Sequence, residues 1–191
     1  MTGRTHDLAA FTTMAFAASI FPIAPISLAT AVTALGANII GGIVPDIDQP
    51  TNEVWHKIPA GSLFGHVIDP LLGNHRMLSH SLFGLVLAGF LIHGFLVLLG
   101  TVLLVNMNLV WWATMLGYFS HLVADSLTKE GVPWFFPVPV RIGFPPLKFL
   151  RITTGGAAEK FLVFPGLVVA NGYLIWQNYS RFIFIFTHLA R

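Results

Sequence analysis

The chain has 191 residues, of which 55% are hydrophobic and 9% are charged, whereas soluble domains carry about 25% charged residues. This composition excludes a conventional water-soluble globule, and it excludes a disordered chain, which needs low hydrophobicity and high charge. The sequence has no cysteine, which excludes disulfides and thiolate metal sites, and its net charge of +2 is too small to indicate nucleic-acid binding. The remaining class is an integral membrane protein.

Five apolar segments predict an all-α bundle of about five transmembrane helices. They are residues 8–21, 26–44, 78–105, 109–127 and 161–176. A span needs about 20 residues, so residues 1–191 are expected to form one membrane-embedded domain. The first segment also resembles a cleaved signal peptide, but the apolar pattern continues past Pro22 and Pro25 into the second segment.

Breaks between these segments predict two helical hairpins followed by a C-terminal helix. Pro22 and Pro25 interrupt the first pair, and Asn106-Met107-Asn108 marks a turn in the second pair. The polar stretch 45–77 between the hairpins is expected to be a surface loop. Residues 132–150 carry five prolines among aromatic and basic residues, a pattern that favours an irregular interfacial lid or a re-entrant segment in the headgroup region.

Basic residues indicate the orientation in the membrane. Hairpin connectivity places eight of the ten Lys and Arg on one face: Arg4, Lys57, Arg76, Lys129, Arg141, Lys148, Arg151 and Lys160. Arg181 and Arg191 fall on the other face. Because cationic loops favour the cytoplasm, the sequence predicts a membrane protein whose polar face is cytoplasmic and whose C-terminus is not.

Seven His and Asp residues are expected to meet at this polar face, because each lies near the same end of an apolar segment. They are His6, Asp46, Asp48, His75, His80, His121 and Asp125. Each signal is weak alone: His121 and Asp125 share a helix face at i and i+4, but such pairs are also structural, and Asp beside Pro is common in turns. Together they favour a metal site, since clustered carboxylates without a cation repel one another.

This ligand set predicts Zn, with Mn or Fe as alternatives, bound as one or two ions. The expected ligands are His6, Asp46, Asp48, His80, His121 and Asp125. His75 is expected to be a further ligand or a general acid/base. Arg76 is suited to hold a phosphate or oxyanion, because its planar fork donates two hydrogen bonds, although an arginine here also suits headgroup anchoring. A cation in such a site makes water nucleophilic near neutral pH.

Two further ionisable residues have different expected roles. His93 lies in the middle of the third segment and is expected to make an interhelical contact. Glu159 precedes the fifth segment, where a carboxylate complements a helix N-terminus. An acid/base role, or a role in supporting the metal ligands, is the alternative for Glu159.

Several motifs resemble those of the YdjM-type inner-membrane proteins, a family described as metal-dependent hydrolases. They are Thr5-His6, residues 44–50 (VPDIDQP), residues 75–81 (HRMLSHS) and residues 116–128 (LGYFSHLVADSLT) with the following Gly131-Val132-Pro133-Trp134. The resemblance extends in order up to Gly156 and Glu159. It implies a membrane hydrolase. The order of the His and Asp residues is also distantly similar to that of the zinc-dependent phospholipase C and single-strand nuclease group.

The chain departs from the family pattern at three positions. Gln49 replaces the histidine of the usual Pro-Asp-Ile-Asp-His-Pro, which removes one imidazole. Met77 and Ser79 stand at the Gly and Thr positions of His-Arg-Gly-x-Thr-His-Ser. None of these departures removes an expected metal ligand.

Residues and resemblance together predict a metal-dependent, phosphoesterase-like hydrolase. Its expected partners are membrane lipids, its expected substrate is a lipid or lipid-linked phosphoester, and no nucleic acid is expected. One alternative is a metal or proton transporter, which needs ionisable residues across the membrane, where the sequence offers His93. Another is a non-catalytic membrane protein in which a structural metal joins the hairpins.

Overall fold

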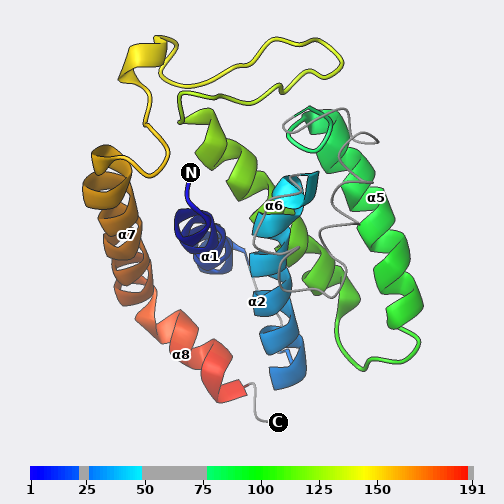
Figure 1. Ribbon diagram of the computed structural model, residues 1–191. Coiled ribbons are helices and arrows are strands. Elements are labelled where there is room, and N and C mark those ends of the chain that lie inside the picture. The colour runs from blue at the N-terminus through cyan, green and yellow to red at the C-terminus, as the bar shows by residue number, and fades with distance from the viewer. Residues whose placement is uncertain (22–25, 49–76, 189–191) are drawn as a thin grey trace, which may run out of the picture.

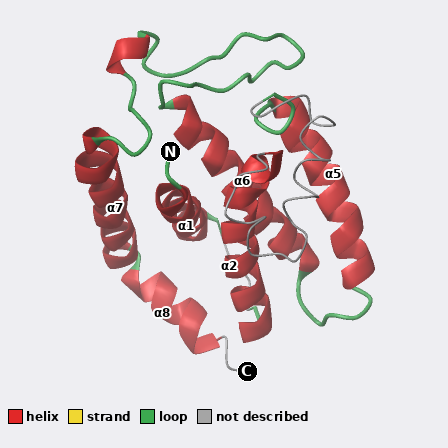
Figure 2. Ribbon diagram, viewed as in Figure 1, coloured by secondary structure: helices red, strands yellow, loops and turns green. Residues whose placement is uncertain are grey.

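The computed structural model describes residues 1–21, 26–48 and 77–188, and these residues form helices joined by irregular segments (Figures 1 and 2). The α-helices are α1 (Gly3–Ile20), α2 (Leu28–Ile43), α5 (Leu82–Leu99), α6 (Met107–Ser126), α7 (Phe164–Gln177) and α8 (Tyr179–His188). Two short 3₁₀ turns, η1 (Val44–Asp48) and η2 (Lys148–Leu150), and a π-helical turn, η3 (Glu159–Val163), complete the elements. The predicted all-α class is confirmed.

Helix α6 lies at the centre of the bundle. It packs against α1, α2 and α5, and α7 packs along α1 on the side away from α5 (Figure 1). Asn171 of α7 donates a hydrogen bond to Thr12 Oγ1 of α1 over 2.8 Å. The N-terminal end of α1 and the C-terminal end of α6 consequently lie at the same end of the molecule (Figure 1).

Two glycines let α2 and α6 approach backbone to backbone. A Cβ atom on Gly117 would stand 1.9 Å from the carbonyl oxygen of Asn38, and one on Gly41 would stand 2.0 Å from that of Thr114. The Asn38 side chain also donates to the carbonyl oxygen of Ala113 over 3.0 Å. Such small-residue contacts are typical of helix pairs in membranes, where close packing replaces the hydrophobic effect.

The helix boundaries confirm part of the expected chain order. Asn106 caps α6, since its Oδ1 accepts from the Leu109 amide over 3.1 Å, which confirms the break predicted there. Residues 44–48 continue α2 as η1 with Pro45 buried, so the prediction of a surface loop from residue 45 is wrong for these residues. Helix α8 was not predicted. The expected turn at Pro22 and Pro25 and the loop over 49–76 lie outside the described residues.

In the described part of the chain, two helical segments have the length and composition to cross a bilayer, Leu28–Ile47 and Leu82–Leu99. The surface of α5 is strongly apolar: Phe90 is 74% exposed and Leu98 is 70% exposed. Exposed apolar surface of this extent favours contact with lipid rather than water. The five-span bundle is not confirmed by these two segments.

The segment after α6 is irregular, as its prolines predict. Isolated backbone bridges join Thr128 to Ile152 and Val132 to Ile142. The indole of Trp134 donates to Ser126 Oγ over 2.9 Å. These contacts hold residues 132–150, here called the lid segment, at the end of the bundle where α6 finishes (Figure 2).

Candidate metal centre

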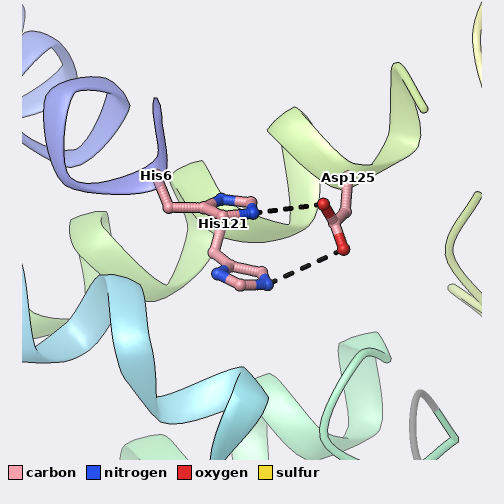
Figure 3. Close-up of side chains that lie close together, drawn as sticks. All are labelled: His6, His121 and Asp125. Atoms are coloured by element: carbon pink, nitrogen blue, oxygen red, sulfur yellow. Dashed lines mark ion pairs between the residues drawn. The ribbon is translucent and has the colours of Figure 1, made fainter. Parts of the chain in front are cut away.

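Five His and Asp side chains meet at one end of the bundle, and we call them the His/Asp cluster. They are His6, Asp46, His80, His121 and Asp125, from α1, η1, the turn before α5, and α6. The three imidazoles and Asp125 are at most 3% exposed, and Asp46 is about one quarter exposed. Figure 3 shows His6 and His121 directed toward Asp125 from two different helices.

Four ligand atoms of the cluster form a compact set. His80 Nε2 lies 3.5 Å from Asp46 Oδ1 and 3.8 Å from Asp125 Oδ2. His121 Nε2 lies 3.6 Å and 3.8 Å from the same two oxygens. Tetrahedral ligands bonded to zinc at about 2.1 Å stand about 3.4 Å apart. These four nitrogen–oxygen distances are close to those between the ligands of a metal site, and Asp46, His80 and His121 form a group of three whose ligand atoms lie within 4.8 Å of one another.

The tautomer of His121 suits metal binding. Its Nδ1 lies 2.7 Å from the carbonyl oxygen of Gly42, and because a carbonyl only accepts hydrogen bonds, Nδ1 carries the proton. The Nε2 of His121 is buried and makes no hydrogen bond to the described residues. Metal-ligating histidines commonly donate their other ring N–H to a carbonyl in this way.

His6 lies on the other side of the Asp125 carboxylate. Its Nε2 is 3.2 Å from Asp125 Oδ1, and its ring stacks on that of His121 with 3.7 Å between centroids (Figure 3). The Met1 amino group also contacts this oxygen. His6, His121 and Asp125 form a second group of three whose ligand atoms lie within 4.8 Å of one another. His121 belongs to both groups of three, and the Asp125 carboxylate lies between His6 on one side and His80 and His121 on the other.

Tyr118 supports the turn that carries His80. Its hydroxyl is buried and donates to the carbonyl oxygen of Ser79, and the Ser79 hydroxyl lies 3.0 Å from His80 Nδ1. Sequence reasoning missed this residue. A signal was available, because Tyr118 precedes His121 by three positions and therefore shares its helix face.

Glu159 is buried next to the first turn of α1 rather than in the cluster. Its Oε1 accepts hydrogen bonds from Thr5 Oγ1 over 2.6 Å and from the amide and hydroxyl of Thr2 over 2.7 Å each, and its Oε2 accepts from the Gly155 amide over 2.7 Å. Burial disfavours the charged form, but these donors outweigh it and lower the pKa of Glu159 to about 2. Glu159 holds the turn on which His6 lies.

The structure does not show the remaining expected residues in the cluster. Asp48 ends η1, and its side chain, like the whole of His75 and Arg76, lies outside the described residues. His93 is away from the cluster, on the α5 face that meets Trp111 of α6, with its ring 6.0 Å from the indole. This contact agrees with its expected interhelical role.

The donor set and its burial fit a divalent transition metal. Imidazole nitrogens and carboxylate oxygens are ligands of Zn, Mn and Fe. A bound cation would satisfy the buried His121 Nε2 and reduce the repulsion between Asp46 and Asp125. The cluster is therefore a candidate metal centre.

Comparison with known proteins gives the family of the chain. Residues 1–187 match the YdjM inner membrane protein family, to which the chain therefore belongs. The chain is also similar to the uncharacterized protein YvsG of Bacillus subtilis, with 27% identity over 184 residues that cover 96% of this chain and all of the relative. No solved structure gives a significant match.

Proposed function

We propose that this YdjM-family protein is a metal-dependent hydrolase of the inner membrane that cleaves a phosphoester of a lipid or a lipid-linked substrate. The observation that carries the proposal is the set of two buried imidazole nitrogens and two carboxylate oxygens, each nitrogen 3.5–3.8 Å from each oxygen. Membership in an inner-membrane protein family supports a substrate that lies in the bilayer.

In this proposal, the His/Asp cluster holds one zinc ion, with Mn or Fe as the alternative metals. The ligand atoms come from His80, His121, Asp46 and Asp125. His6 orients the Asp125 carboxylate, or it forms a second metal site together with Asp125 Oδ1. Asp48 is an additional ligand. When bound, the cation lowers the pKa of water and supplies a nucleophile at neutral pH.

His75 and Arg76 complete the proposal from the sequence. They precede the turn that carries His80 by a few residues. Arg76 binds the phosphate of the substrate through its two-pronged guanidinium, and His75 transfers a proton as a general acid or base.

The site lies at the cytoplasmic end of a five-span bundle in this proposal. The spans are α1, α2, α5, α6 and the helix that runs over residues 161–176. The exposed apolar residues of this last helix support its contact with lipid, because Phe161 and Trp176 are each 75% exposed. The orientation follows from the basic residues, since eight of the ten belong to segments at the cluster end of the predicted spans.

The test combines metal content with hydrolysis in the purified, detergent-solubilised protein. Mass spectrometry of metals is expected to find about one or two equivalents of Zn, Mn or Fe in the wild type. The His121→Ala variant should lose this metal, whereas His93→Ala, a histidine away from the cluster, should keep it. Phosphatidic acid and a polyprenyl phosphate serve as first substrates, and phosphate release should require the metal.

Each other outcome assigns a different function. A folded wild type without stoichiometric transition metal overturns the proposal. Metal that raises the melting temperature without any phosphoesterase activity over a broad substrate screen indicates a structural site. Metal or proton flux in proteoliposomes that His121→Ala abolishes, without hydrolysis, indicates a transporter.

A further inference from the structure

A groove lies between α5 and α6 with a volume of about 650 Å³. Its walls include Leu85 and Gly89 of α5 and Trp111, Met115 and Phe119 of α6. The lining is mainly aliphatic and aromatic. A groove of this size is within the range of small-ligand sites, which run to about 1,000 Å³.

The polar groups of the groove are few, and one of the largest is already satisfied. The Trp111 indole N–H donates to the carbonyl oxygen of Gly89 over 2.8 Å. This bond crosses from α6 to α5, so the indole presents its apolar ring to the groove. The other polar side chains of the lining, His93 and Asn108, lie at the end away from Leu85 and Phe119. The rest of the lining is apolar and favours a hydrocarbon over a polar ligand.

One end of the groove is level with the His/Asp cluster along the helix axes, and the groove extends away from that level. Phe119 precedes His121 by two residues on α6, and Leu85 follows His80 by five residues. At a rise of about 1.5 Å per residue, the lining from Leu85 to His93 covers about 12 Å of α5. The hydrocarbon layer of one leaflet is about 15 Å thick. The groove therefore has nearly the length of a leaflet, and its end at Leu85 and Phe119 is level with the cluster.

The lid segment meets the groove at the cluster end. The ring of Trp134 stands edge-on to Phe119, a groove residue, with 6.3 Å between centroids. The backbone of Trp134 accepts a hydrogen bond from the Leu82 amide over 3.0 Å, at the first turn of α5. The lid segment is thus joined to both walls of the groove where they approach the cluster.

We propose that this groove binds one hydrocarbon chain of a membrane lipid whose phosphate-bearing headgroup lies at the His/Asp cluster. This inference rests on the proposed function and names its substrate class: a phospholipid or a polyprenyl phosphate, recognised by its tail as well as by its phosphate. A soluble phosphoester without a tail is then a poor substrate, because it forgoes the apolar contacts of the groove.

Gly89 provides the variant that tests the groove. A Cβ atom there would stand 3.2 Å from Met115 Cε and 3.6 Å from the Trp111 ring, so a larger side chain would occupy the groove. Gly94 lies on the same helix, and a Cβ atom there would meet nothing within 4 Å. Gly89→Leu and Gly94→Leu therefore make the same chemical change inside and outside the groove.

The experiment is native mass spectrometry of the full chain in detergent, with palmitoyl-oleoyl phosphatidic acid as probe. The wild type and Gly94→Leu should retain one lipid, and Gly89→Leu should bind it about tenfold more weakly or worse. Glycerol phosphate, which has the headgroup without chains, should not bind measurably. If Gly89→Leu unfolds, Met115→Trp replaces it as the groove-filling variant.

The outcomes separate the groove from the proposed function. Equal lipid retention by Gly89→Leu, Met115→Trp and the wild type overturns the groove proposal, even if metal and hydrolysis are found. Selective loss of lipid in the groove variants, with metal content unchanged, supports the groove. If such a protein holds no metal and hydrolyses nothing, the groove is a lipid site and the proposed enzyme activity fails.

Discussion

The rings of His6 and His121 stack in parallel, with 3.7 Å between centroids and 9° between their planes. They come from α1 and α6, and both face Asp125. The stack fixes the orientation of both rings relative to the Asp125 carboxylate. Ligand side chains held in this way by neighbouring groups are typical of metal sites.

The close approach of α2 to α6 predicts that adding one methyl group at Gly117 strongly destabilises the protein. We expect Gly117→Ala to destabilise the protein by about 2–3 kcal/mol or to prevent folding, because the new Cβ atom meets the Asn38 backbone. Gly36→Ala is the control, since a Cβ atom there meets nothing within 4 Å. The control should change stability by less than about 1 kcal/mol. Thermal unfolding in detergent measures both, and equal melting temperatures would contradict the backbone contact.

The hydrogen bond of Tyr118 predicts that a substitution there lowers metal affinity although it changes no metal ligand. In Tyr118→Phe, the Ser79 carbonyl loses its donor, so the turn that carries His80 should be less well fixed. We expect metal affinity to fall by about tenfold or more, as for other residues that orient metal ligands. Competition with a chromogenic chelator gives the affinity. Tyr173→Phe, at a residue that is 53% exposed, should match the wild type, and a Tyr118→Phe protein that also matches it would rule out this support.

Chain order was sufficient to predict that the cluster residues meet, because alternating helices return the chain to the same end. His6, Asp46, His80, His121 and Asp125 lie at helix ends that connectivity alone places together. The interactions that orient their side chains were not predictable in this way. The Tyr118–Ser79 bond joins residues 39 positions apart, and the His121–Gly42 bond joins residues 79 apart. Such contacts depend on helix rotation and packing, which the apolar pattern does not specify.

The apolar pattern also limited the prediction of the C-terminal region. Residues 161–176 were expected to form one helix, and α7 does cover most of them. Helix α8 follows after Asn178, whose backbone leaves the helical region at φ −108° and ψ 25°. Its mixed sequence, with Ser180 and Arg181 among aromatic residues, lacks the long continuous apolar run by which the other segments were recognised.

The distribution of basic residues predicts on which side of the membrane the C-terminus lies. A reporter fused after residue 191 should read as non-cytoplasmic, because eight of the ten basic residues belong to the opposite end of the predicted bundle. Paired fusions with alkaline phosphatase and green fluorescent protein measure this directly, since each is active on one side of the membrane. A fusion after Asn106, between α5 and α6, should read the same way as the C-terminal fusion. Cytoplasmic readings from the C-terminal fusion alone would remove the fifth span.

The Glu159 contacts predict an acid-sensitive contribution to stability. The pKa of Glu159 is lowered from 4.5 to about 2 in the folded protein, so folding favours the charged carboxylate. Its contribution is fully present above about pH 4.5 and is lost as the pH falls toward 2. Glu159→Gln replaces one accepting oxygen with an NH₂ group. This donor would face either the Thr2 and Thr5 donors or the Gly155 amide, which is also a donor. We expect it to cost about 1–3 kcal/mol near neutral pH.

The difference in melting temperature between the wild type and Glu159→Gln should therefore shrink steadily as the pH is lowered below 4.5. Glu130→Gln is the control, because Glu130 is exposed and its pair with Arg141, 3.6 Å away, lies at the surface, where such pairs contribute about 0–1 kcal/mol. The metal content of Glu159→Gln adds a second readout. If Glu159 positions the α1 turn that carries His6, metal retention should fall in this variant, whereas a purely structural clamp would lower the melting temperature and leave the metal in place.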